Sequence, residues 1–415
     1  MKRRSFIGLF LSGSAPLGSA DRHRVLSPSD LNFLEMIQKA SFRYFLEEIN
    51  EEKGLVRDRS NPEAPASIAA TGFGLTAYAI AAEKGWVSHE KALQIVKTCL
   101  RFFANEAENQ SGFLYHFLDF STGQRYQEKW KSEISSVDTT WLLSGVCIAK
   151  VVFNTDRDVV RWATDIEERI DWNWMLDSEK TLSMGWTPES GFLPYRWDHY
   201  AEHLLMYLFA IGSPTHPIPA DCWLAWKREW THYKGYRYLW GPPLFIHQYS
   251  HAFVDFRKWR DATADYWDSS VQATLANRQF CMDRSNQFRS YGPDSWGLTA
   301  CDGPEGYRAY GAEDGWHDGT VAPCAAAGSL PFVPNICLSA LRYFYHTHGD
   351  KLWGRYGFKD AFNLDRNWWA TDWVGIDQGI TVIMIENLIS GKVWQWMEQV
   401  PSIRNGIRLV GFVRR

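Results

Sequence analysis

The connections between the predicted helices of this chain alternate between short and long. Apolar residues at three- and four-residue spacing predict about twelve helices, near residues 29–51, 68–85, 88–108, 136–153, 156–174, 198–212, 219–231, 244–257, 261–283, 333–348, 350–362 and 378–391. A short hairpin is predicted between residues 113–118 and 125–126. Long connections fall near residues 52–67, 109–135, 175–197, 232–243, 284–332 and 363–377. If neighbouring helices are antiparallel, all of these long loops emerge at the same end of the fold.

Several helices that follow long loops are also the most apolar, namely 136–153, 198–212, 333–348 and 378–391. A helix that is apolar on all sides must be buried on all sides. We therefore predict an all-α fold, a single (α/α)6 toroid with buried inner helices and amphipathic outer helices. Because loops on a rigid scaffold carry chemistry, the functional site is expected at the long-loop face.

Residues 1–20 have the pattern of an export signal, which leaves residues 21–415 as one catalytic domain. Lys2, Arg3 and Arg4 precede a weakly apolar stretch, and Gly18-Ser19-Ala20 offers a cleavage site. The pair Arg3-Arg4 resembles the twin-arginine signal, which predicts a periplasmic or secreted protein. The stretch is too short and too rich in Gly and Ser to span a membrane.

The amino-acid composition limits which classes of molecule this protein is expected to bind. A net charge of −4, with both signs interspersed, argues against a nucleic-acid surface. The 7 cysteines have no paired spacing and are expected to be core residues rather than a disulfide framework. The 22 Trp, 18 Tyr and 24 Phe fit a carbohydrate site, because sugar rings stack on aromatic side chains, but large helical cores use many aromatics too. We expect the protein to act as a monomer.

Three carboxylates are predicted at the beginnings of buried helices, on the long-loop face. Glu202 is expected in the first turn of a helix that begins at Asp198, Asp138 in the first turn of a second helix, and Asp377 at the mouth of a third. Glu133 lies just before Asp138. Carboxylates at these positions are also favoured by the helix dipole and by capping, so each has a purely structural explanation as well.

Paired carboxylates suit the cleavage of a glycosidic bond. One must protonate the leaving oxygen while another activates water, and an inverting enzyme separates the two by roughly 6.5–9.5 Å. We predict Glu202 as the general acid, with Asp138 or Asp377 as the base or the group that orients water. Substrate contacts are predicted from loop residues near these acids: Glu133, His116, Trp186, Trp197, His251, Glu305, Arg308 and Trp316.

Two alternatives start from the same residues. His199-Tyr-Ala-Glu202-His203 matches the H-x-x-E-H pattern of zinc hydrolases, although no downstream Glu is marked as the third ligand by its context. The other alternative is a sugar-binding protein without catalysis.

Eight segments resemble the glycoamylase-like domain family that includes the endo-β-1,2-glucanases of glycoside hydrolase family 144. They are GFLYHFLD with TGQRY, SEISSVDTTWLLSGV, HYAEHLLMYLFAIGSPTHP, LFIHQYSHAFVDFR, YWDSSVQATLANR, GPEGYRAYGA, DGTVAPCAAAGSLPFVP and VGIDQGITVIMIENLISG, in consistent order over residues 70–400.

This resemblance implies an (α/α)6 barrel, no metal or other cofactor, and inverting hydrolysis of β-1,2-glucan. It implies that Glu202 is the acid, and that Asp377, Glu133 and Asp138 are the other essential groups. Relatives include exo-acting and transferring enzymes, so action on chain ends or on another β-glucan linkage is an alternative. Residues 124–132 depart from the family pattern because Glu128 is their only acid.

Overall fold

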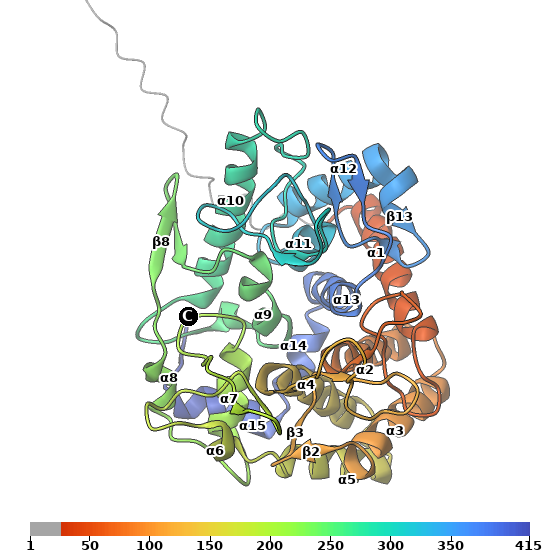
Figure 1. Cartoon of the computed structure of the whole chain (residues 1–415), viewed down its shortest axis with the longest axis vertical. Coiled ribbons are helices and arrows are strands. Elements are labelled where there is room, and N and C mark those ends of the chain that lie inside the picture. The colour runs from red at the N-terminus through yellow and green to blue at the C-terminus, as the bar shows by residue number, and fades with distance from the viewer. Residues whose placement is uncertain (1–25) are drawn as a thin grey trace, which may run out of the picture.

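The computed structural model describes residues 26–415 and is mostly helical, with short strands between the helices (Figure 1). The predicted export signal, residues 1–20, lies outside the described residues. The α-helices are α1 (Pro28–Glu47), α2 (Ile68–Glu83), α3 (His89–Asn105), α4 (Ser136–Val152), α5 (Arg157–Glu168), α6 (Trp172–Met175), α7 (Leu204–Gly212), α8 (Cys222–Ala225), α9 (Tyr249–Phe253), α10 (Tyr266–Asp283), α11 (Pro323–Gly328), α12 (Pro334–Leu352), α13 (Gly375–Ile389), α14 (Lys392–Met397) and α15 (Pro401–Leu409).

The short 3-10 helices and strands lie in the connections between these α-helices. They are η2 (Leu244–His247), η3 (Phe256–Lys258), β1 (Ala66–Ser67), β2 (Asn109–Gln110), β3 (Phe113–Leu114), β4 (Phe117–Leu118), β5 (Ile134–Ser135), β6 (Gly185–Thr187), β7 (Gly191–Phe192), β8 (Trp230–Tyr233), β9 (Tyr236–Leu239), β10 (Trp259–Arg260), β11 (Ala300–Cys301), β12 (Arg308–Ala309), β13 (Trp353–Gly354), β14 (Gly357–Phe358), β15 (Phe362–Asn363), β16 (Trp368–Trp369) and β17 (Val413–Arg414). The predicted hairpin at residues 113–126 is confirmed, since Leu118 pairs with Arg125.

Helices α2, α4, α7, α9, α11 and α13 are buried along nearly their whole length. Helix α2 contacts α4 and α13, α4 contacts α7, α7 contacts α9, and α11 contacts α13, while η2 lies between α9 and α11. Figure 1 shows α13 end-on with α2, α9 and α11 near it. Most of their side chains are apolar because protein surrounds each helix.

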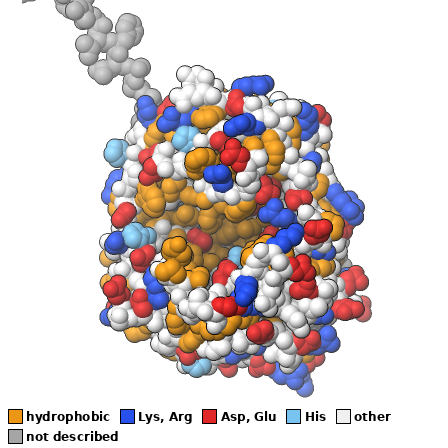
Figure 2. All heavy atoms as spheres, in the orientation of Figure 1, with side chains coloured by type: hydrophobic (Ala, Val, Ile, Leu, Met, Phe, Trp, Pro, Cys, Tyr) orange, Lys and Arg blue, Asp and Glu red, His pale blue; other side chains and the backbone are white. Residues whose placement is uncertain are grey.

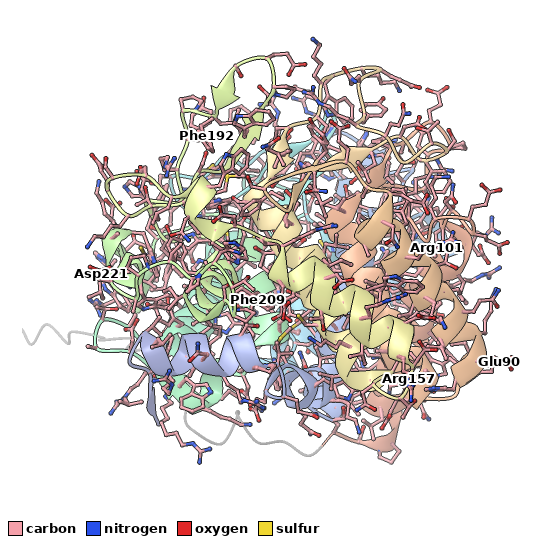
Figure 3. The ribbon with its side chains drawn as sticks, turned by 90° about the horizontal axis from the view of Figure 1, so that it is seen from below. Glu90, Arg101, Arg157, Phe192, Phe209 and Asp221 are labelled. Atoms are coloured by element: carbon pink, nitrogen blue, oxygen red, sulfur yellow. The ribbon has the colours of Figure 1, made fainter. Side chains whose placement is uncertain are left out.

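The remaining long helices bury one side only. Helix α5 buries Val159, Ala163 and Ile166 and begins at the exposed Arg157. Figure 3 shows Arg157, and Glu90 of α3, at the outside of the molecule, whereas Phe209 of α7 lies inside. This is the amphipathic pattern expected of helices that cover a core.

Two pairs of helices approach so closely that only glycine fits between them. A Cβ on Gly145 of α4 would lie 2.1 Å from the carbonyl oxygen of Gly72 on α2, and a Cβ on Gly72 would lie 2.2 Å from that of Trp141. The same relation holds between α7 and α15, where a Cβ on Gly212 would lie 1.9 Å from the Ser402 oxygen and one on Gly406 would lie 2.2 Å from the Leu208 oxygen. These glycines fix the position of α4 and α7, which carry the candidate site.

Four predicted helices differ from the structure. The helix predicted at 244–257 is three short pieces, η2, α9 and η3. The helix predicted at 198–212 begins only at Leu204, because the backbones of Asp198 and Tyr200 bond to Lys227 instead of forming a helical turn. The segment predicted as a helix at 350–362 is the end of α12 followed by the β13–β14 hairpin, where Gly357 has a φ of +84° that a helix does not allow.

The fourth incorrect prediction is the helix at 219–231. It contains only the four residues of α8, and its end forms β8, which pairs with β9 across a turn at Lys234 and Gly235. Helices α11, α14 and α15 were not predicted, because α11 lies inside a long loop and the other two lie beyond the last predicted helix.

The cysteines agree with the sequence analysis. All 7 cysteines lie within residues 26–415, and each is free and buried. Over the same residues, every helix is too short or too polar to cross a lipid bilayer.

Candidate active site

A cavity of about 540 Å³ opens on one face of the molecule (Figure 2). Its wall includes residues from four of the predicted long loops, through Asp58, His116, Tyr307 and Val374. The beginning of α4 and the segment before α7 complete it with Asp138 and Glu202. The prediction that chemistry lies where long loops meet buried helices therefore leads to this cavity, whose size is typical of small-molecule sites.

Glu202 lies immediately before α7 rather than inside its first turn. His203 occupies the N-cap position, and Ser250 of α9 donates its hydroxyl to the Glu202 carbonyl and accepts a bond from the Leu205 amide at 3.0 Å. These bonds fix the backbone that carries the carboxyl. Burial raises the pKa of Glu202 to about 7, and the negative charge of Asp138 adds to the increase. A carboxyl with such a pKa keeps a proton near neutral pH, as a general acid requires.

Asp138, His116 and Glu133 form a connected group beside Glu202. The His116 ring places Nε2 at 3.4 Å from Asp138 Oδ1 and Nδ1 at 3.0 Å from Glu133 Oε1. Burial opposes the charged ring, but Asp138 and Glu133 outweigh it and raise the pKa of His116 to about 9. His116 is therefore a cation that holds the two carboxylates at fixed positions. Asp138 is the third residue after the N-cap Ser135, and its amide donates to the Ser135 hydroxyl at 3.2 Å.

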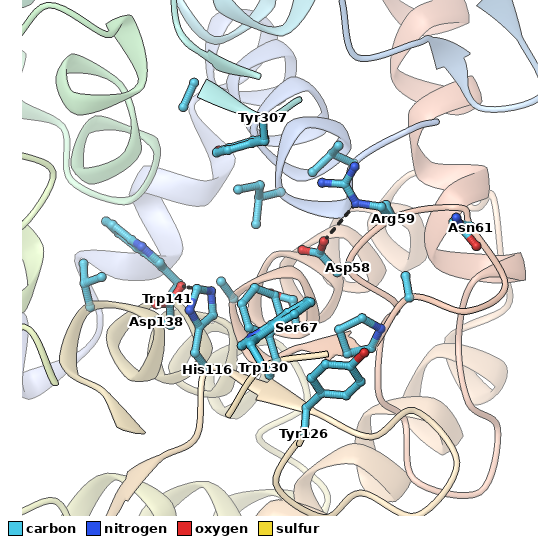
Figure 4. Close-up of a pocket in the computed structure, with 18 of the residues that line it drawn as sticks. Asp58, Arg59, Asn61, Ser67, His116, Tyr126, Trp130, Asp138, Trp141 and Tyr307 are labelled. Carbon is cyan, nitrogen blue, oxygen red and sulfur yellow. Dashed lines mark hydrogen bonds and ion pairs between the residues drawn. The ribbon is translucent and has the colours of Figure 1, made fainter. Parts of the chain in front are cut away.

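Asp58 and Arg59 were missed by the sequence analysis and lie at the centre of the cavity wall (Figure 4). Arg59 places Nε at 3.4 Å from Asp58 and Nη1 at 2.9 Å from Asp302. Burial raises the pKa of Asp58, while Arg59 and His116 oppose the increase. The sequence signal for Asp58 is the Arg-Asp-Arg run in the first long loop. All long loops are predicted at one end of the fold, so charged residues in this loop lie at the same end as the other site residues.

Aromatic side chains supply much of the remaining wall. They are Phe117, Tyr126, Trp130, Trp141, Phe245, Tyr249 and Tyr307. Trp130 is 43% exposed and Tyr307 53% exposed, so both present ring surface to the cavity mouth, while Trp141 is buried. Flat rings beside fixed carboxylates form a surface on which a sugar ring can stack.

Asp377 lies behind this wall rather than in it. The neighbouring residues Val374 and Ile376 line the cavity, whereas Asp377 is 5% exposed and lies beside Asp360 and Cys324. Burial and the nearby Asp377 charge raise the pKa of Asp360 well above its ordinary value, so Asp360 holds a proton beside its neighbour. Its Oδ2 accepts a bond from the Asp302 amide at 2.6 Å, which links this group to Arg59.

Comparisons with known proteins identify the fold and the family. The family model described as Glycoamylase matches residues 194–401, half of the chain. A glucoamylase-type structure from Bacteroides uniformis is 31% identical, with a TM-score of 0.88, and the match covers 94% of this chain and 99% of that one. This chain belongs to the glycoamylase family.

Two proteins similar to this chain carry names that state an activity. The endo-β-1,2-glucanase of Chitinophaga pinensis, in complex with sophorotriose and glucose, is 28% identical with a TM-score of 0.84, and the match covers 94% of this chain and 99% of that one. An exo β-1,2-glucooligosaccharide sophorohydrolase (non-reducing end) of Parabacteroides distasonis is 28% identical over an alignment 424 residues long, gaps included. The alignment covers 93% of this chain. This chain spans only 58% of that curated relative. Both names describe glycoside hydrolases.

Seven residues predicted to contact substrate lie outside the cavity wall of this glycoamylase-family member. One of them, Glu133, is linked to the cavity only through His116. Trp197 is buried and donates its indole N–H to Ser136 at 2.9 Å, and His251 is completely buried and bonded to Ser270. Trp186 pairs with Ile134 and Phe192 in the β5–β6–β7 sheet. The others, Glu305, Arg308 and Trp316, form an exposed group in which the Arg308 guanidinium lies 4.7 Å from the Trp316 ring.

The H-x-x-E-H pattern is not assembled as zinc ligands. His199 is on the surface and bonds to Asp198 at 2.9 Å, while His203 is completely buried between Trp197 and Trp226. The pattern requires both rings on one helical face, and residues 199–203 are not helical.

Proposed function

We propose that this protein hydrolyses β-1,2-linked glucan or its oligosaccharides, with inversion at the anomeric carbon, in an (α/α)6 barrel. The observation that carries the proposal is the Glu202 carboxyl in the cavity wall, with its pKa raised to about 7, beside the ordered Asp138–His116–Glu133 group. The two named relatives supply the linkage, since both act on β-1,2-linked glucose chains by their names.

In this proposal Glu202 protonates the oxygen of the leaving sugar. Its proton is available because the protonated form persists near neutral pH, and the glycosidic C–O bond breaks as the proton transfers. Water adds to the anomeric carbon from the opposite side and gives up a proton to a carboxylate, so the product is a free sugar with inverted configuration.

We propose that Asp138, rather than Asp377, orients the attacking water and accepts its proton. Asp138 lines the cavity and is held by His116, whereas Asp377 is behind Ile376 and touches Asp360 and Cys324. Asp58 also lines the cavity and is the second candidate to accept the proton. In this proposal Asp377 affects the reaction indirectly, because it fixes the positions of Val374 and Ile376 in the cavity wall.

The proposal includes export by the twin-arginine route and action as a monomer in the periplasm. The Arg3-Arg4 pair supports the first, because this pathway carries folded proteins. A fusion of residues 1–25 to a reporter, with Arg3→Lys/Arg4→Lys as its control, tests the route.

The activity is tested by incubating the purified protein with linear β-1,2-glucan, beside β-1,3- and β-1,4-glucan. We expect new reducing ends from the β-1,2-linked chain only, and polarimetry should show the inverted anomer first. Cleavage of another glucan in preference would overturn the linkage. If no β-glucan yields reducing ends at high enzyme loading, the protein binds sugar without cleaving it. Loss of activity on chelation, with stoichiometric metal bound, would favour the zinc alternative.

A further inference from the structure

The longest loop of the chain, between β11 and α11, carries exposed aromatic side chains from the cavity to the outer surface. Tyr307 lines the cavity, and Figure 4 shows it on the opposite side of the drawn residues from Tyr126. The next residue, Arg308, lies over the Trp316 ring at 4.7 Å. Trp316 is 53% exposed, as Tyr307 is. The loop therefore presents one ring inside the cavity mouth and a second ring just outside it.

A third exposed ring, Trp240, is attached to the same loop. Trp240 follows β9, is 39% exposed and donates its indole N–H to Asp314 at 3.1 Å. The loop backbone is held at this point, because a Cβ on Gly311 would lie 2.4 Å from Pro242, and the Gly311 amide donates to the Trp316 carbonyl at 2.8 Å. The two backbones are therefore in direct contact. We call the three connected rings the rim band: Tyr307, Trp316 and Trp240.

Charged side chains border the Trp316 ring. Arg308 pairs with Glu305 at 3.3 Å, and Arg366 lies 3.7 Å from the other Glu305 oxygen. All three side chains are more than a third exposed, so their donors and acceptors remain open to a ligand. A sugar offers a C–H face that can stack on an aromatic ring and hydroxyl groups at its edge that can bond to charged groups. The surroundings of Trp316 supply both kinds of contact.

We propose that the rim band binds those glucose units of a β-1,2-glucan chain that extend beyond the cavity. This inference rests on the proposed function. The cavity, of about 540 Å³, can hold only a short part of a polymer, so the rest of a bound chain must pass over its rim. Because Tyr307 belongs to both the cavity wall and the band, the two surfaces are continuous, and the occupant of the band is the chain that enters the cavity. The band then adds affinity for long chains without contact with the cleaved bond.

The dependence of KM on chain length tests this inference. In Trp316→Ala we expect KM for polymeric β-1,2-glucan to rise by about three- to tenfold with kcat unchanged, since one aromatic contact contributes about tenfold at most. For the shortest β-1,2-linked oligosaccharide that the wild type cleaves, KM should stay at the wild-type value. Trp316→Phe keeps a flat ring and should restore most of the loss. Trp240→Ala should give a smaller rise in KM, since only the longest chains reach this ring.

Binding without turnover gives a second readout. The Glu202→Gln/Trp316→Ala protein should bind the polymer about three- to tenfold more weakly than Glu202→Gln does, by calorimetry, and the short oligosaccharide equally well. Trp162→Ala is the matched control. Trp162 is also paired with an arginine, since Arg161 lies 5.4 Å from its ring. It lies on α5, which is described over its whole length and contributes no residue to the cavity wall. Its KM for both substrates should equal that of the wild type.

The possible failures are distinguishable. Wild-type KM values for Trp316→Ala on both substrates would overturn this inference and leave the proposed function standing. An equal rise in KM for the polymer and the short oligosaccharide would also overturn it, because Trp316 would then act by supporting the cavity. A wild-type protein that cleaves no β-1,2-glucan of any length would overturn the proposed function itself.

Discussion

Glu202 and Asp377 both lie beside the beginning of a buried helix, yet their carboxyls have different neighbours. Glu202 precedes α7 and faces the cavity, while Asp377 is in the first turn of α13 and faces Asp360 and Cys324. Burial raises the pKa of both. A raised pKa alone therefore does not distinguish a proton donor from a carboxyl that supports the wall. Access to the cavity does distinguish them.

Replacement of the cavity carboxyl should have the largest effect. Glu202→Gln keeps the shape of the side chain but cannot donate an acidic proton, so we expect kcat on linear β-1,2-glucan to fall by about 10²–10⁴-fold. Initial rates of reducing-end formation measure this, and circular dichroism checks the fold. A folded Glu202→Gln protein with wild-type turnover would remove Glu202 from the mechanism.

Replacement of the carboxyl behind the wall should cost less. Asp377→Asn keeps the size of the side chain but removes the carboxylate that is hydrogen-bonded to Asp360. The loss of activity should then come from a shift of Val374 and Ile376 in the cavity wall. We expect kcat to fall by about 10–100-fold, the scale of small errors in positioning.

Chemical rescue separates position from chemistry in this second prediction. Azide is an anionic nucleophile that needs no base, so it can attack the anomeric carbon in place of the activated water and leave a glycosyl azide. It should therefore restore part of the bond cleavage by Asp138→Asn, measured as azide product, and none of that by Asp377→Asn. Asp360→Asn serves as the matched control because Asp360 belongs to the same buried group. Rescue of Asp377→Asn by azide would place Asp377 at the substrate after all.

The different positions of Glu202 and Asp377 also show how much of the site could be predicted from the sequence. Alternating loop lengths and wholly apolar helices were enough to predict buried helices with the site at the long-loop end, and Glu202, Asp138 and His116 do meet there. Periodicity could not show that Asp377 turns away from the cavity, because a first-turn position fixes the helix end and not the direction of a side chain.

Side chains in long loops were the least predictable. Trp316 and Arg308 were grouped with the site because the longest loop could reach it, but they pack on each other at the surface. Asp58 and Trp130 were missed, because their positions depend on bonds made by Arg57 and Arg125 to distant backbone. Such contacts are set by tertiary packing and leave no periodic pattern.

The His116 cation, which contacts Asp138 near Glu202, allows a third test of whether Glu202 is the proton donor. His116→Gln removes a positive charge next to Asp138, so the unbalanced carboxylates should raise the pKa of Glu202 further. The basic limb of the kcat/KM profile, which lies near pH 7 in the wild type if Glu202 is the acid, should move to higher pH, and activity should fall about tenfold. His199→Gln is the control, since His199 bonds to Asp198 outside the cavity. An unshifted limb in His116→Gln would separate Glu202 from that limb.

The smallest effect concerns stability and follows from the same pKa. Glu202 has a folded-state pKa of about 7 against an ordinary value of 4.5, so between these pH values the folded protein binds more protons than the unfolded chain. Stability must then decrease as pH rises from 4.5 to 7, and the free carboxylate destabilises the fold above pH 7. Glu202→Gln removes this term, so we expect the variant to be more stable than the wild type at pH 8, by about 1–2 kcal/mol after allowance for partial exposure. At pH 4 the two should be equal. Urea titrations at both pH values measure the difference, and a variant that is less stable at pH 8 would show that the Glu202 carboxylate is stabilised where it lies.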